Sequence, residues 1–328
     1  MFKMQKARDW FLVIVVNFMW STQVPVIRLI GDRVGPMNLA FVPMLVSTLM
    51  FLPFLWAENR KRKRSERRTW KDLRYFIIPG LIGVFLMQYL YTVGSTRTLA
   101  SNAGIITLTI PVLVALFASI LLKEKLNIVR ILGFVIALAG VLLTSLPDLQ
   151  SASFSQGSFF TGNLIFLVAC AFAAFFNTYS KLLVDKGFTE LEILVYCSLV
   201  GSIASIPLLI WVEPLSISKI IHSDNIVIFG LLELSFIVYG ISMLLFFYIL
   251  KRMDVTQAIL GNYLLPFFIA LLGIILLNEK ITATMIIGGI IIFAGTLMVT
   301  VYEKQLLSFF KGKNRADMKK GEVAQEIA

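Results

Sequence analysis

The feature that most constrains this chain is a succession of long apolar blocks separated by short charged connections. A bilayer core about 30 Å thick needs roughly 20 apolar residues for one helical crossing, and the blocks have that length. A helix also bonds every backbone N–H and C=O internally, as lipid requires. A membrane β-barrel would instead show segments of about ten alternating residues. The pattern therefore predicts an all-α membrane protein.

The number of blocks predicts ten transmembrane helices. Only 15% of the residues are charged and 58% are hydrophobic, too few charges for the surface of a soluble protein of this length. The first block follows Lys3, Lys6 and Arg8 and runs on to Arg28 without a small-residue cleavage site. It is therefore interpreted as a retained helix and not as a signal peptide. The predicted helices occupy residues 10–30, 36–56, 75–94, 102–122, 128–146, 160–181, 191–212, 226–249, 257–277 and 284–302.

Basic residues are distributed unevenly over the connections. If the amino terminus is cytoplasmic, 25 of the 30 Lys and Arg residues face the cytoplasm and five face the other side. The densest run lies at residues 60–64, whereas the long connection 147–161 has none. This positive-inside pattern predicts a multi-pass protein of the cell inner (plasma) membrane with both termini cytoplasmic, the tail 304–328 included. It accounts for the net charge of +11 without a nucleic-acid partner.

The two halves of the chain repeat each other at a shift of 155 residues. Between Leu90 and Leu142 the shifted sequences share 17 identities in 53 positions without a gap. Matches of Leu on Leu are expected from composition, but coincident Pro, Glu-Lys and paired Gly are not. These informative matches place Pro111 on Pro266, Glu124-Lys125 on Glu279-Lys280, Gly133 on Gly288 and Gly140 on Gly295.

An odd number of crossings in each repeat has a topological consequence. A unit of five helices ends on the side of the membrane opposite to the side where it began. The second unit therefore has the inverted orientation in the membrane. We therefore predict two inverted five-helix repeats, residues 1–146 and 160–303. Inverted repeats are a common basis of secondary transporters that work by alternating access.

The repeated segments also resemble a known family. Residues 103–126 read AGIITLTIPVLVALFASILLKEKL, and residues 258–281 read AILGNYLLPFFIALLGIILLNEKI. Together with Trp20 and Arg28 in the first helix, they look like the drug/metabolite transporter superfamily, EamA-type. The resemblance implies a central cavity lined by helices 1, 3, 4, 6, 8 and 9, and often export of amino acids or other metabolites. Pro43 and Ala173 depart from the family pattern, in positions where an Arg and an aromatic residue are expected.

Polar and aromatic residues inside the predicted helices are the candidates for a solute site. Amides within a bilayer either bond other helices or orient a solute in a mostly apolar pocket. Pro111 and Pro266 each remove a helical hydrogen bond near mid-helix, and we interpret them as hinges or as bends needed for packing. The candidate cavity residues are Trp20, Gln88, Tyr91, Asn102, Asn177, Glu233, Gln257 and Asn262.

Glu233 differs from the other candidates because it is the only acidic residue well inside a predicted helix. An unpaired carboxylate at that depth costs several kcal/mol, so the side chain should be neutral, paired or in contact with water. We interpret Glu233 as a ligand of a solute amine or as the carrier of a coupled proton, or else as a protonated or snorkelling side chain.

The function predicted from these features is secondary transport of a small metabolite, an amino acid or a related compound, by alternating access and in the export direction. No Gly-rich phosphate-binding loop is present. His222 is the single histidine, and Cys170 and Cys197 lie in apolar blocks, so neither an enzyme active site nor a metal or cofactor site is expected. The partners expected are a small solute, the lipid bilayer and a coupled proton. The alternatives are a nucleotide-sugar or sugar-phosphate carrier and a membrane subunit without transport activity.

Overall fold

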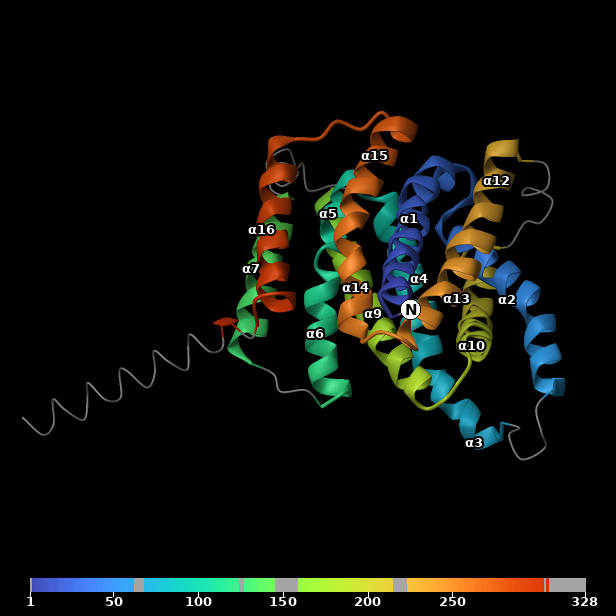
Figure 1. The fold of residues 1–328 in the computed structure, drawn as a ribbon. Helices are drawn as coiled ribbons and strands as arrows, with labels where there is room; N and C mark the ends of the chain where they lie inside the picture. The colour runs from blue at the N-terminus through green and yellow to red at the C-terminus, as the bar shows by residue number, and fades with distance from the viewer. Residues whose placement is uncertain are drawn as a thin grey trace, which may run out of the picture.

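The computed structural model describes residues 2–61, 68–123, 127–144, 159–214, 223–303 and 305–306, and these residues form helices without strands. The helices run up and down in one bundle, and α3 lies at the end opposite to the α1–α2 turn (Figure 1). The first half comprises α1 (Phe2–Val34), α2 (Pro36–Lys61), α3 (Trp70–Leu73), η2 (Arg74–Phe76), η3 (Pro79–Leu86), α4 (Met87–Thr96), α5 (Ala100–Thr107), α6 (Ile110–Leu121) and α7 (Ile128–Thr144). The second half comprises α9 (Phe159–Asp185), α10 (Glu190–Trp211), α12 (Asn225–Glu233), η4 (Leu234–Ile241), α13 (Ser242–Leu250), α14 (Val255–Ile259), η5 (Leu260–Leu264), α15 (Leu265–Leu277) and α16 (Ala283–Thr300).

These elements make ten crossings, which confirms the predicted fold class. Eight helical stretches are long and apolar enough to span a bilayer, and two shorter apolar helices, α7 and α16, complete the set. Helix α7 has 17 residues, or about 26 Å at the usual rise, so it still approaches the thickness of the hydrocarbon core. The predicted tail 304–328 falls almost entirely outside the described residues.

The repeat that is visible in the sequence reappears as matched irregularities of the helices. The third crossing of each half contains a π-helical segment, η3 at Pro79–Leu86 and η4 at Leu234–Ile241. The starts and the ends of these segments both differ by 155, the shift found in the sequence. Because π-helical turns are rare and often mark functional sites, their placement at equivalent positions indicates that both halves are built on one unit.

The fourth crossing of each half is interrupted just before its proline. Between α5 and α6 the chain makes short-range bonds, from Leu108 N to Ile105 O at 3.1 Å and from Thr109 N to Ile106 O at 3.0 Å. In the second half the 3₁₀ segment η5 takes the same place. Pro111 and Pro266 therefore lie in the first turn of α6 and of α15, where a missing N–H costs nothing. The sequence predicted a bend within one helix; the structure has a break followed by a new helix. A hinge role at these breaks stays a prediction.

One contact between the two halves is made by α7 and α16, which lie side by side in Figure 1. The paired glycines face each other across this contact in crossed order. A Cβ atom on Gly133 would lie 2.7 Å from the carbonyl oxygen of Gly295, and one on Gly140 would lie 2.8 Å from that of Gly288. Such close backbone approach is the usual role of small residues between helices in lipid. The crossed order is the arrangement that two antiparallel copies related by a twofold axis must have.

Substitution of adjacent glycines in α16 should separate packing from helix propensity. A Cβ atom on Gly288 would lie 2.4 Å from Thr144 Cγ2, whereas one on Gly289 would meet only Ile105, at 3.6 Å. We expect Gly288→Ala to lower the free energy of unfolding by about 1–3 kcal/mol through overpacking. Gly289→Ala should be neutral or slightly stabilising. Thermal unfolding in detergent measures both, and equal effects of the two changes would contradict the close α7–α16 contact.

Two carboxylates join the halves at the end of the bundle where α1 passes into α2. Glu279 follows α15, and its carboxylate accepts hydrogen bonds from Ala100 N at 2.7 Å and Ser101 N at 2.9 Å at the start of α5. Arg28 Nε lies 3.5 Å from the same carboxylate. Glu213 follows α10 and accepts from Asn38 N at 3.0 Å at the start of α2. Anionic groups stabilise helix N-termini, so in both cases the second half caps a helix of the first.

Candidate functional site

A cavity lies between the two halves near the middle of the bundle. It offers about 60 Å³ to the centres of water molecules, and one water needs roughly 10–15 Å³ by this measure. The space therefore suits a few waters, and a metabolite needs the helices to move apart. Six crossings line it, the first, third, fourth, sixth, eighth and ninth. The lining residues are Trp20, Gln23, Met87, Gln88, Tyr91, Thr107, Ile110, Ala173, Phe176, Asn177, Tyr239, Met243, Asn262 and Leu265.

Part of the lining follows the internal repeat, as expected for a cavity between two repeated halves. Three pairs of its residues are separated by the 155-residue shift. In two pairs the chemistry differs between the halves, which makes the site asymmetric although its backbone is symmetric. The pairs are Thr107 with Asn262, Gln88 with Met243 and Ile110 with Leu265.

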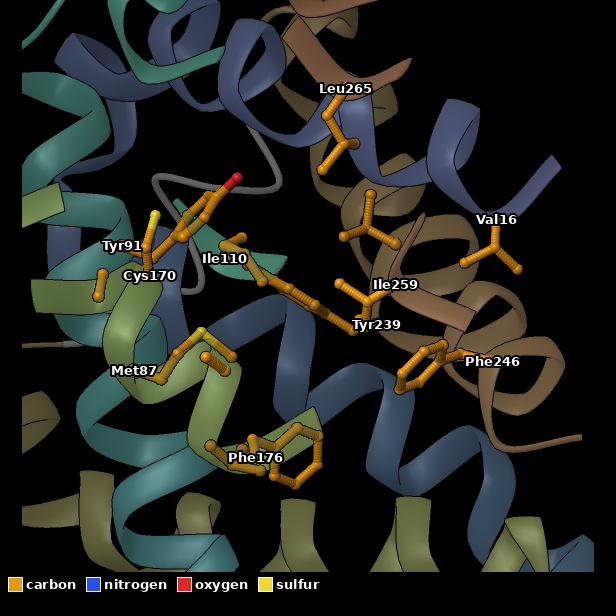
Figure 2. Packing of buried hydrophobic residues seen from close by; sticks show 14 of the residues in the cluster. Val16, Met87, Tyr91, Ile110, Cys170, Phe176, Tyr239, Phe246, Ile259 and Leu265 are labelled. Atoms are coloured by element: carbon orange, nitrogen blue, oxygen red, sulfur yellow. The ribbon is translucent and has the colours of Figure 1, made fainter. Parts of the chain in front are cut away.

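Most of the wall is apolar and aromatic. Figure 2 shows Met87, Ile110, Phe176 and Tyr239 extending from different helices toward a shared space. Tyr91 stacks at a tilt on Phe166, with 4.6 Å between the ring centroids. Pockets for small molecules are typically lined in this way, with a few polar groups that orient the ligand.

Three polar atoms of the lining are buried and have no hydrogen-bond partner within the described part of the chain. They are Nε1 of Trp20, Nε2 of Gln88 and Oδ1 of Asn262. Gln88 is 4% exposed and Asn262 is 1% exposed. Buried polar groups are normally satisfied, so two N–H donors and one acceptor are left for a solute or for water. By contrast, Gln23 Nε2 donates to the Tyr239 hydroxyl at 3.0 Å.

Five of the eight predicted cavity residues line this space: Trp20, Gln88, Tyr91, Asn177 and Asn262. Their contact with a solute stays a prediction.

Asn102 and Gln257 do not line the cavity. Asn102 is buried in the first turn of α5 and Gln257 is exposed in the first turn of α14. The two residues are equivalent under the repeat. Because the two halves are inverted, residues that start equivalent helices lie at opposite ends of the bundle, away from its middle.

Glu233 does not line the cavity either. Its carboxylate accepts a hydrogen bond from the Thr22 hydroxyl of α1. Its second oxygen, Oε2, is buried and has no partner among the described residues. The sequence placed Glu233 within the eighth predicted helix, but the direction of its side chain depends on how α12 packs against α1.

Gln23, Thr107 and Met243 line the cavity and were not predicted. A signal for two of them was present, because Thr107 and Met243 are the repeat equivalents of Asn262 and Gln88. No group of three His, Cys, Asp or Glu side chains that could hold a metal ion occurs in the ranges that the structure describes. Cys170 and Cys197 are buried and unpaired.

Comparison with known sequences identifies relatives of the whole chain. The EamA-like transporter family matches residues 10–146 and again residues 160–301. An uncharacterized transporter of Archaeoglobus fulgidus is 26% identical over 300 residues, which cover 91% of this chain and 99% of that protein. An S-adenosylmethionine uptake transporter of Rickettsia felis is 23% identical over 305 residues, 91% of this chain and 94% of that protein.

A solved crystal structure has the same fold. It superposes with a TM-score of 0.62 at 17% identity and covers 92% of this chain and 99% of its own. At this identity the similarity concerns the fold alone.

Proposed function

The chain belongs to the EamA-like transporter family, and on this premise we propose that it is a secondary carrier that moves a small metabolite through the central cavity by alternating access. It is a multi-pass membrane transporter and not an enzyme. The cavity carries the proposal: it lies where the inverted halves meet, and it holds buried polar atoms without partners. In carriers with inverted repeats, solute sites lie near the membrane midplane between the repeats.

The small size of the cavity supports a cycle with at least two states. Its volume of about 60 Å³ is well below the roughly 300–1,000 Å³ of pockets that hold drug-sized ligands. Binding therefore requires the walls to separate. The carboxylates of Glu279 and Glu213 tie the halves together at one end, and access from that end requires these bonds to break.

We propose an amino acid or a related compound as the solute and export as the direction. The named relative from Rickettsia felis is an uptake transporter for S-adenosylmethionine, which supports a small organic metabolite but not a direction. A nucleotide-sugar or sugar-phosphate carrier would need cations for the phosphate, and the cavity lining contains no Lys or Arg among the described residues. We further propose the plasma membrane, with both termini cytoplasmic, from the positive-inside pattern.

Counterflow in proteoliposomes tests the proposal. Purified protein is reconstituted into vesicles loaded with a mixture of unlabelled amino acids and nucleosides. The same mixture in ¹³C-labelled form is added outside, and exchange is followed by mass spectrometry. We expect one compound or one chemical group to exchange far faster than in vesicles without protein. Uniformly slow exchange of the whole mixture, by protein that unfolds cooperatively, would contradict the carrier function for these solutes.

A further inference from the structure

Glu233 occupies a position that distinguishes the two halves. It is the last residue of α12 and directly precedes the π-helical segment η4. The 155-residue shift places Ile78 at the equivalent position, directly before η3. An acidic group therefore stands in one copy of a repeated backbone feature and an apolar group in the other. Packing of the shared fold does not require this acid, since the same backbone accepts isoleucine.

The surroundings of Glu233 provide one donor and no cation within the described part of the chain. Thr22 donates its hydroxyl hydrogen to one carboxylate oxygen, and the other oxygen is buried without a partner.

The charged groups of the neighbouring elements are engaged elsewhere or lie at the far end. On α1, Arg28 lies beside Glu279, and Arg33 bonds Asp224 at 2.8 Å; Asp32 follows in the same region. On α2 the charged residues Glu58, Arg60 and Lys61 are in the last turns. The titratable group of η4 is Tyr239. An ionised carboxylate here would lack a counter-charge, which is costly inside a membrane.

Adjacent residues of α1 connect this carboxylate to the cavity. Thr22 bonds Glu233, and the next residue, Gln23, donates to the hydroxyl of Tyr239. Gln23 and Tyr239 both line the cavity. Glu233 and Tyr239 belong to one continuous stretch that passes through the π-helical turn of η4. A change at Glu233 therefore acts on the α1–η4 contact that forms part of the cavity wall.

We propose that Glu233 binds the coupling proton, at a site beside the solute cavity and not within it. The proposal rests on the proposed carrier function. The proton adds to a carboxylate oxygen, forms an O–H bond and removes one negative charge; its release to water on the other side of the membrane restores the carboxylate. The ionised form needs water or a new donor, so the α1–η4 contact must loosen. The neutral form lets that contact stay closed.

The test compares two transport modes of the same vesicles. Counterflow of a labelled solute needs no net proton movement, whereas uphill accumulation driven by an imposed pH gradient does. Proton flux is followed with pyranine trapped inside the vesicles. We expect Glu233→Gln, a neutral mimic of the protonated acid, to retain counterflow within about threefold, a loss of less than about 0.7 kcal/mol. It should lose both gradient-driven accumulation and solute-dependent proton flux.

The controls separate this inference from the carrier function. Asp224→Asn changes an exposed carboxylate at the start of the same helix and should leave both modes unchanged. Accumulation and proton flux of wild-type size in Glu233→Gln would overturn the inference. Wild-type vesicles without counterflow would instead refute the carrier function for the solutes tested.

A second variant covers the case in which Glu233→Gln does not fold. Thr22→Val removes the hydroxyl that bonds the carboxylate, together with its bond to Met19 O at 2.7 Å within α1, and nearly conserves volume. We expect it to shift the pH at which proton-coupled accumulation is half-maximal, while counterflow continues. An unchanged pH profile in Thr22→Val with intact counterflow would also overturn the inference.

Discussion

Replacement of Ala173 by phenylalanine should abolish transport and leave a folded protein. Ala173 lies on α9 with its methyl group at the cavity. A phenyl ring there takes up space that a solute needs, in a cavity that offers only about 60 Å³ to water centres. We expect counterflow to fall to the level of vesicles without protein. Stability should fall by no more than about 1–3 kcal/mol, the usual cost of a larger side chain in a packed interior.

The matched control for this variant lies on the same helix. Val168 is 46% exposed and points out of the bundle, so Val168→Phe adds a ring on the outer surface of α9. It should transport like the wild type. Wild-type counterflow by Ala173→Phe would show that the solute does not pass this point of the cavity.

Removal of the unpaired polar atoms of the cavity should lower transport without loss of stability. Asn262→Leu and Gln88→Leu each replace a buried amide by an apolar side chain of similar size. If these amides bond the solute, each change should lower counterflow about tenfold or more, since a lost hydrogen bond costs about 1–3 kcal/mol. The melting temperature should stay constant or rise, because each variant no longer buries an unsatisfied polar atom.

A variant that loses counterflow but keeps or gains stability identifies the replaced amide as a solute-binding group. Replacement of an amide with a structural role would instead lower both counterflow and stability. Ser202→Ala is the control: Ser202 on α10 is 3% exposed, its hydroxyl has no partner within the described residues, and it is not part of the cavity lining. It should leave counterflow unchanged. If both leucine variants transported at the wild-type rate, Gln88 and Asn262 would have no role in solute binding.

The periodic parts of the fold were predictable from the sequence because their causes are local or symmetric. Continuous apolar runs demand helices in lipid, and every predicted crossing has its helix in the structure. Gly133 and Gly140 are seven residues apart, as are Gly288 and Gly295, so each pair lies on one face of its helix, and only small residues allow two backbones to approach closely in lipid. The crossed contacts of these glycines then follow from inversion.

The candidate site was predictable only in part. Hydropathy places a polar residue at a depth in the membrane but does not say which neighbour it faces. By hydropathy alone, Asn102 and Gln257 were candidates for the cavity on the same footing as Gln88 and Asn262. The structure puts Asn102 and Gln257 in the first turns of α5 and α14, at the ends of the bundle. The sequence identified Glu233 as an acidic residue within a predicted helix, yet its partner Thr22 is 211 residues away in the chain.

The amino-acid sequence by itself determined the number of crossings, their inversion and the shift that relates the halves. These properties depend on the length of the apolar runs, on whether the number of crossings in each repeat is odd or even, and on internal repetition. All three follow from the order of residues along the chain. Only the tertiary structure decided that the prolines follow breaks between helices, that two carboxylates cap helices of the other half, and that Glu233 lies beside the cavity. Such contacts depend on the rotation of each helix about its axis, which is set by packing among several helices at once.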